Sequence, residues 1–215
     1  MREEAVMKRL KNFLFLSATL LMLAQLAQAD DPIQPQFKGA DAKAVDTAKN
    51  LRLAQRFNES IELLLPIAKR EPDYYRAMYQ LALACAERAQ SASKQPKDIE
   101  NADKWFRMAI AQKEQLQAAG KPLDEYTIYN SYGWFLIENG RFKEAEASLL
   151  KGLAELDKLP SATSRQRVLN NLSLVYKRQG RFNEAADLSK KAIDLGSLTA
   201  QKNLIEIQQM AKSKN

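Results

Sequence analysis

The sequence VLNNLSLVYKRQGRFNEAADLSKKAIDL, residues 168–195, decides the fold of this 215-residue chain. Val168, Leu172 and Val175 recur at the spacing of one helical face, which predicts a first helix. Gly180 then allows a sharp turn, because glycine has no Cβ to clash in a left-handed backbone conformation. Helical spacing resumes after this turn, so a second helix should run antiparallel to the first.

Small residues should let these two helices approach each other closely. Ala185 and Ala192 alternate with larger side chains on the second helix. We therefore expect Tyr176 and Phe182 to be buried between the helices. One such hairpin cannot bury its second apolar face alone, so it needs neighbouring hairpins.

The corner that joins the two helices recurs upstream. Arg-Phe-Asn-Glu follows Gly180, Arg-Phe-Lys-Glu occupies 141–144, and Arg-Phe-Asn-Glu occupies 56–59. Equivalent small residues are separated by 42, 43 and 40 positions: Ser60, Ala102, Ala145 and Ala185. Self-similarity at a nearly constant period is the sequence signature of a repeat protein.

These hairpins resemble tetratricopeptide repeats, the helix-turn-helix units of peptide-binding solenoids. In the copy quoted above, the matching residues are Leu172, Tyr176, Gly180, Phe182, Ala185 and Ala192. In the copy before it, they are Tyr132, Gly133, Leu136, Gly140, Phe142, Ala145, Gly152 and Leu153. Two earlier copies match more loosely: the first has Gln55 instead of the corner glycine, and the second has an insertion between its helices. The period is longer than the usual one of about 34 residues, and together with the Asn170-Asn171-Leu172 run it resembles the repeats of kinesin light chains.

The resemblance implies an all-α, right-handed superhelical solenoid of antiparallel helix pairs. We expect four pairs, at about 41–72, 73–118, 124–159 and 163–197. Residues 198–215 should form a capping helix and tail, because the end of a solenoid needs a polar outer surface. Docking of that helix on a partner is the alternative. Residues 30–40 contain two prolines and a glycine, which predicts an extended linker.

The first 29 residues have the composition of a secretory signal peptide. Basic residues at 8–11 precede an apolar run at 13–24, and Ala27-Gln28-Ala29 gives the small-residue cleavage pattern. We predict cleavage after Ala29 and export to a bacterial periplasm. An uncleaved anchor is the alternative, but the apolar run is shorter than the roughly 20 residues that a spanning helix needs. Met7 is an alternative start to Met1, because it removes two acidic residues from the basic region.

Net charge limits the choice of partner only slightly. The chain has a net charge of +7, and cleavage after Ala29 would leave 29 basic and 24 acidic residues, a net charge of +5. Basic and acidic residues are interspersed without a long basic run, so they favour anionic partners weakly. We expect no nucleic acid as a partner of an exported chain, and no stable membrane insertion after the signal peptide is removed.

The residues on which most enzyme chemistry depends are missing or isolated. The chain has no histidine, which excludes histidine metal sites and histidine bases. Its single cysteine, Cys85, lies among apolar residues of a predicted helix, so we expect a buried, unreactive thiol and no intramolecular disulfide. No glycine-rich phosphate loop occurs, and no pair of acidic residues is suited to acid–base catalysis. We therefore expect no enzyme activity, no metal and no cofactor.

In a tetratricopeptide array the first helix of each pair lines a concave groove, and the resemblance gives this role to residues beside the core face. The predicted peptide-binding residues are Lys49, Arg52, Tyr79, Asn130, Trp134, Arg167, Asn170, Asn171, Leu174 and Lys177. Asparagine amides can donate to and accept from an extended peptide backbone. Trp134 could bury an apolar side chain of the peptide, and Arg167 or Lys177 could pair with a carboxylate. The alternatives are that Trp134 packs between helices and that Asn130 and Asn170 bridge neighbouring repeats.

The sequence thus predicts a non-catalytic scaffold that binds an extended peptide segment of another envelope or secreted protein. Two alternatives remain open. One is a structural protein that assembles with itself end to end, and the other is an accessory module that binds a cell-wall glycan or peptide.

Overall fold

A computed structural model describes residues 39–120, 127–156 and 161–213. The chain divides into two units, 1–38 and 39–215, and only the second is described. The predicted signal peptide, its cleavage site after Ala29 and the predicted linker up to residue 38 lie outside the described residues.

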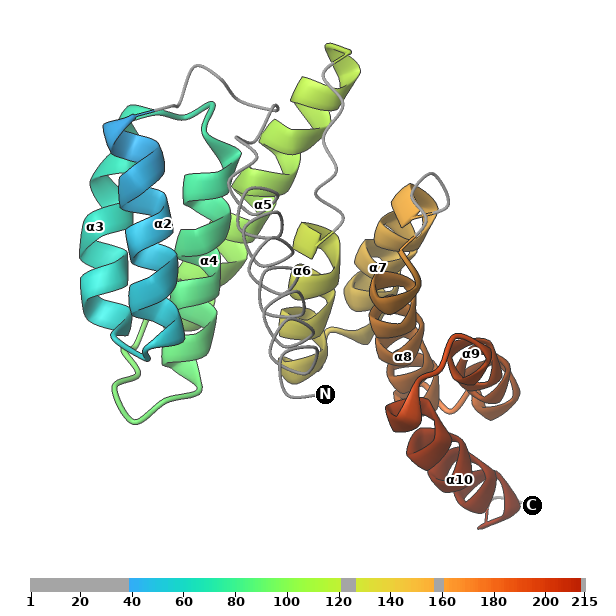
Figure 1. Cartoon of the computed structure of the whole chain (residues 1–215). Coiled ribbons are helices and arrows are strands. Elements are labelled where there is room, and N and C mark those ends of the chain that lie inside the picture. The colour runs from blue at the N-terminus through green and yellow to red at the C-terminus, as the bar shows by residue number, and fades with distance from the viewer. Residues whose placement is uncertain (1–38, 121–126, 157–160, 214–215) are drawn as a thin grey trace, which may run out of the picture. The chain divides into compact units, whose positions relative to one another are not determined.

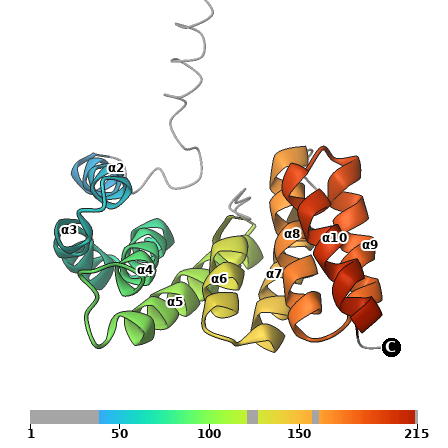
Figure 2. The same cartoon turned by 90° about the horizontal axis from the view of Figure 1, so that it is seen from below.

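All regular structure in the described residues is helical, and the predicted all-α helical repeat fold is confirmed. The helices are α2 (Ala40–Leu53), α3 (Phe57–Arg70), α4 (Tyr75–Ala89), α5 (Asp98–Ala118), α6 (Thr127–Glu138), α7 (Phe142–Leu156), α8 (Ala162–Arg178), α9 (Phe182–Asp194) and α10 (Leu198–Ser213). Consecutive helices lie side by side in chain order from α2 to α10 (Figures 1 and 2). Among the described helices, none is long and apolar enough to cross a membrane.

Small residues bring the two helices of a pair close together. Ala185 and Ala192 in α9 are fully buried. Gly133 in α6 lies so near Leu149 in α7 that a Cβ on residue 133 would be 2.6 Å from Leu149 Cγ. The buried hydroxyl of Ser173 in α8 donates to the Ala185 carbonyl at 2.8 Å. Small side chains therefore set the short distance between paired helices, as ridges-into-grooves packing requires.

The corners of the first, third and fourth helix pairs each contain a residue with a left-handed backbone. The φ angle is 73° at Gly140, 78° at Gly180 and 60° at Gln55. Residues with a Cβ seldom adopt this conformation, because Cβ crowds the following carbonyl oxygen. The first corner therefore has the same geometry as the others with a less suitable residue.

Tyr176 and Phe182 are partly exposed, so the prediction that the hairpin buries them was wrong in degree. The guanidinium carbon of Arg181 lies 3.7 Å from the centroid of the Tyr176 ring. A cation over the ring face is attracted by the ring quadrupole. Arg181, at the corner, therefore covers part of the Tyr176 ring that the paired helix was expected to bury.

Corner arginines also join each repeat to the one before it. Arg181 Nη1 donates to Glu146 in α7 at 2.8 Å, and the same guanidinium pairs with Glu184 in its own helix. In the preceding repeat, Arg141 Nη1 donates to Asp103 in α5 at 2.7 Å. In both cases the accepting carboxylate lies on the second helix of the previous pair.

Helix α10 covers the end of the array. Ala200 and Ile207 are buried on the side that faces α8 and α9. The opposite side carries Leu198 and Ile205, which are 74% and 57% exposed. With Met210, which is also exposed, α10 therefore has three large apolar side chains in solvent.

Candidate functional site: a groove across the inner helices

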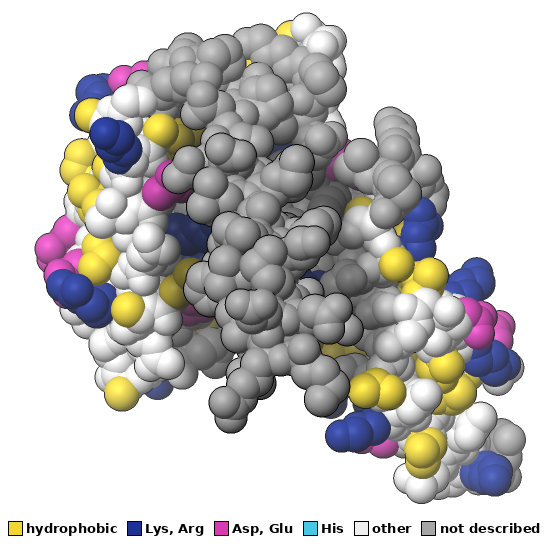
Figure 3. Space-filling view, viewed as in Figure 1, with side chains coloured by type: hydrophobic (Ala, Val, Ile, Leu, Met, Phe, Trp, Pro, Cys, Tyr) yellow, Lys and Arg dark blue, Asp and Glu magenta, His cyan; other side chains and the backbone are white. Residues whose placement is uncertain are grey.

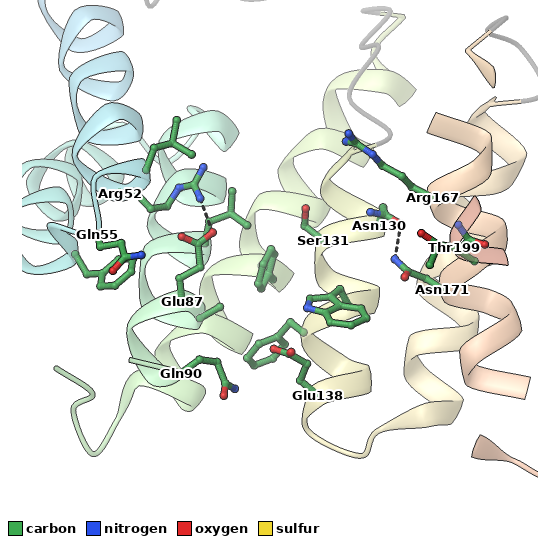
Figure 4. A pocket seen from close by; sticks show the side chains of 18 residues that line it. Arg52, Gln55, Glu87, Gln90, Asn130, Ser131, Glu138, Arg167, Asn171 and Thr199 are labelled. Atoms are coloured by element: carbon green, nitrogen blue, oxygen red, sulfur yellow. Dashed lines mark hydrogen bonds and ion pairs between the residues drawn. The ribbon is translucent and has the colours of Figure 1, made fainter. Parts of the chain in front are cut away.

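A groove of about 740 Å³ crosses the first helices of the pairs, α2, α4, α6 and α8. Its lining extends from Arg52 in α2 to Thr199 in α10 (Figure 4). Six of the ten predicted peptide-binding residues line it: Arg52, Asn130, Trp134, Arg167, Asn170 and Asn171. The structure thus brings together residues that are far apart in the sequence.

Helices α4 and α6 form two walls of this groove. The lining residues on α4 and at its C-terminal cap are Leu83, Ala86, Glu87 and Gln90, and those on α6 are Ser131, Trp134, Phe135 and Glu138. Each set has the i, i+3, i+4, i+7 spacing of one helical face. Phe106 from α5 also lines the groove, and its ring centroid lies 5.6 Å from Phe135 in α6 and 6.3 Å from Tyr79 in α4.

The other four predicted residues do not line the groove. Tyr79 is buried, and its hydroxyl lies 2.8 Å from Ser131 Oγ, a contact that joins α4 to α6. Lys177 Nζ pairs with Glu206 of α10 at 2.8 Å. Lys49 is exposed and Leu174 is partly buried. Tyr79 and Lys177 therefore contact neighbouring helices in this structure.

Asparagines occupy the part of the groove between α6 and α8. Asn171 Nδ2 donates to Asn130 Oδ1 at 2.9 Å, as the dashed line in Figure 4 marks. Within the described residues, Asn130 Nδ2 and Asn171 Oδ1 have no hydrogen-bond partner. Asn170 Nδ2 donates to Ser197 Oγ at 2.9 Å, while its Oδ1 is buried without a partner in the described structure. Asparagines do bridge neighbouring elements here, and the Asn130–Asn171 pair still has one donor and one acceptor free.

Two arginines and two glutamates give the groove its charges. Arg52 forms an ion pair with Glu87 across α2 and α4. Burial raises the pKa of Glu87, and Arg52 opposes this increase. Arg167 is exposed, and so is Glu138 at the end of α6; neither has an ion-pair partner among the residues that the structure describes. The groove therefore contains one internally neutralised pair and two separate charges of opposite sign.

Sequence reasoning missed Glu87, Glu138 and Phe106 as groove residues. Glu138 follows Trp134 by four positions on the same helical face, so the spacing alone could have found it. Phe106 lies on α5, the second helix of its pair, whereas only the first helices were expected to line the groove. No sequence signal shows that this fully buried ring contributes to the groove lining between α4 and α6.

Other reactive groups are few. Cys85 is buried, as predicted, and burial raises the pKa of its thiol to about 12, so the thiol is neutral near pH 7. Across the described ranges, no cluster of three or more acidic or cysteine side chains could hold a metal ion. In the face that Figure 3 presents, basic and acidic side chains are interspersed over the described elements.

Two segments of the chain match models of the tetratricopeptide repeat, residues 126–154 and 166–196. They cover most of the α6–α7 and α8–α9 pairs, so these two pairs in the second half of the chain match tetratricopeptide repeats. A comparison with curated protein sequences found no match.

Several solved structures share the fold at low sequence identity. PilF of Pseudomonas aeruginosa is 21% identical, with a TM-score of 0.61 over 80% of this chain and 71% of that one. PilW, described as a widely conserved type IV pilus biogenesis factor, is 23% identical, with a TM-score of 0.62 over 80% and 70%. A putative kinesin light chain from Podosopora anserina with nearly identical repeats is 16% identical, with a TM-score of 0.63 over 80% and 86%. These likenesses show a common tetratricopeptide-like solenoid fold.

Proposed function

We propose that this chain is a non-catalytic scaffold that binds an extended peptide segment of another envelope protein in the groove. The observation that carries the proposal is the Asn130–Asn171 pair, which has one free donor and one free acceptor in the groove lining. A peptide group carries one carbonyl and one N–H. The pair can therefore bind the backbone of a partner without regard to its side chains.

Arg167 supports the same proposal. Its guanidinium is exposed on α8 and lines the groove beside the asparagines, as Figure 4 shows. A carboxylate of the partner can form a bidentate ion pair with a guanidinium. We infer that Arg167 binds an acidic side chain or a chain terminus near the asparagine pair.

The location that we propose is the periplasm. The support is the predicted signal peptide and the description of PilW, a protein of similar fold, as a pilus biogenesis factor. Tetratricopeptide repeats favour protein binding over catalysis, and the chain has no histidine. We therefore propose an assembly role in the envelope.

Capture of a partner from envelope extract tests this proposal. The purified chain is immobilised, the captured protein is identified by mass spectrometry, and its dissociation constant is measured with both proteins pure. Replacing Asn171 and Arg167 together with alanine should weaken binding at least about tenfold, because central polar anchors carry a large share of binding energy.

A matched control uses the same residue types in the same repeat. Asn183 and Arg178 are exposed and lie outside the groove, so their double alanine variant should bind like the wild type. Thermal unfolding of both variants separates lost binding from lost stability. Full binding by the folded Asn171/Arg167 variant would refute the groove as the binding site.

A further inference from the structure

The gap between α4 and α6 is built differently from the asparagine part of the groove. We call it the wedge. One wall is formed by Leu83, Ala86 and Glu87 on α4 with Gln90 at its C-terminal cap, and the other by Ser131, Trp134, Phe135 and Glu138 on α6. The Tyr79–Ser131 contact joins the two helices at the start of the wedge. Each wall continues from there for two helical turns towards the C-terminal end of its helix.

The interior of the wedge is apolar. Phe106 is fully buried, and Phe135 is 5% exposed beside it. Trp134 is 44% exposed on the same wall, although it is one of the largest apolar side chains in the chain. The wedge therefore leaves aromatic surface in contact with solvent, and covering that surface is favourable.

The rim of the wedge favours a positively charged group on a bound ligand. Glu138 is the last residue of α6, and Gln90 directly follows the end of α4. The C-terminal ends of both helices carry partial negative charge, which makes a carboxylate at this position unfavourable unless a cation lies nearby. Glu138 has no ion-pair partner in the described parts of the chain, and Arg52, the arginine that lines the groove on α2, already pairs with Glu87. The rim thus has an uncompensated negative charge.

We propose that the wedge binds a large apolar side chain of the partner peptide, and that a lysine or arginine next to it in the peptide pairs with Glu138. The inference rests on the proposed peptide-binding function and adds a chemical class to it: a basic–apolar motif. The wedge and the asparagine pair then recognise different parts of the same peptide. The asparagines bind peptide backbone, and the wedge selects side chains.

Trp134 is also the reporter for the test, because Trp105, the other tryptophan, is buried. The full chain is titrated with three unlabelled, capped hexapeptides while tryptophan emission is recorded. One has a central Phe-Lys, one replaces the Phe with Ala, and one replaces the Lys with Glu. The Phe-Lys peptide should shift the emission to shorter wavelength and bind about tenfold more tightly than the Ala-Lys peptide. It should bind about threefold more tightly than the Phe-Glu peptide.

Two variants of the wedge have matched controls. Ala86→Phe fills the interior and should abolish the response, whereas Ala147→Phe, on an exposed position of α7, should leave it unchanged. Glu138→Lys should make the Phe-Glu peptide bind more tightly than the Phe-Lys peptide. Glu62→Lys, the same change on an exposed position of α3, should keep the wild-type order.

The outcomes separate the two proposals. No emission change with any peptide at millimolar concentration would overturn the wedge as a side-chain site, as would a full response in the folded Ala86→Phe variant. Tighter binding of the Phe-Glu peptide by the wild type would overturn the basic motif. If the captured partner needs Asn171 and Arg167 but binds the Ala86→Phe variant normally, the wedge assignment fails while the proposed function stands.

Discussion

Gln55 has the backbone conformation that glycine has at the later corners of the array. Its φ of 60° places a Cβ in the left-handed region, which costs about 1–2 kcal/mol. Glycine would remove that cost but would lose about 0.5–1 kcal/mol in chain entropy. We therefore expect Gln55→Gly to stabilise the fold by about 0.5–1 kcal/mol, as measured by urea unfolding.

The converse change is the control for Gln55. Gly180→Gln places a Cβ at a φ of 78° and should lower the free energy of unfolding by a similar amount. A loss of stability in Gln55→Gly would mean that the glutamine side chain contributes more than its strained backbone costs.

Single residues differ in how well their surroundings could be read from the sequence. Ala185 and Ala192 were predicted to be at the helix contact, because small residues at a close approach follow from helical spacing alone. Tyr176 was predicted to be buried, but the cover of its ring by Arg181 depends on the rotamer of a corner side chain. The contact between Arg181 and the Tyr176 ring depends on tertiary structure, so the helical period of the sequence could not predict it.

At the scale of the helix, a corner arginine that binds a carboxylate of the previous repeat should contribute more to the free energy of unfolding than a corner arginine that does not. Arg141 binds Asp103 in α5 as well as Glu144, whereas among the residues that the structure describes Arg56 forms an ion pair only with Glu59, in the helix that directly follows it. We expect Arg141→Ala to cost about 1 kcal/mol, because a partly buried, charge-assisted hydrogen bond between repeats is lost.

The matched control for Arg141→Ala is Arg56→Ala, which removes only an exposed pair within one helix and should cost much less. Urea unfolding at neutral pH measures both variants. Equal losses in the two would show that the contact between repeats adds nothing to the contact within the helix.

Helices and their pairing could be predicted because each hairpin carries its own local signals, the apolar period and the corner. The groove depends on how far neighbouring hairpins are apart, and local spacing does not encode that distance. Lys177 illustrates the limit, because its partner Glu206 comes from α10, two helices further along and 29 residues away. The wedge between α4 and α6 was not predicted for the same reason.

Over the whole array, carboxylates are held ionised by neighbouring cations. The groups whose pKa lies below its ordinary value are Glu59, Asp103, Glu144, Glu146, Glu184 and Glu206. They are distributed over α3, α5, α7, α9 and α10. Glu87 behaves oppositely, because burial raises its pKa. Acid should therefore weaken ion pairs in every part of the array.

The sign of the effect follows from proton binding. A carboxylate with a lower pKa in the folded chain stabilises the fold above its unfolded pKa, and this contribution is lost as the pH falls through its folded pKa. The hydrogen bond from Arg141 is the main cause that lowers the pKa of Glu144 from 4.5 to about 2. We expect the midpoint of thermal unfolding, followed by circular dichroism, to fall as the pH decreases from about 4.5 to about 2. Salt at about 1 M should reduce the decrease, because it screens exposed pairs. A midpoint that is constant or rises over this range would show that the ion pairs contribute no net stability.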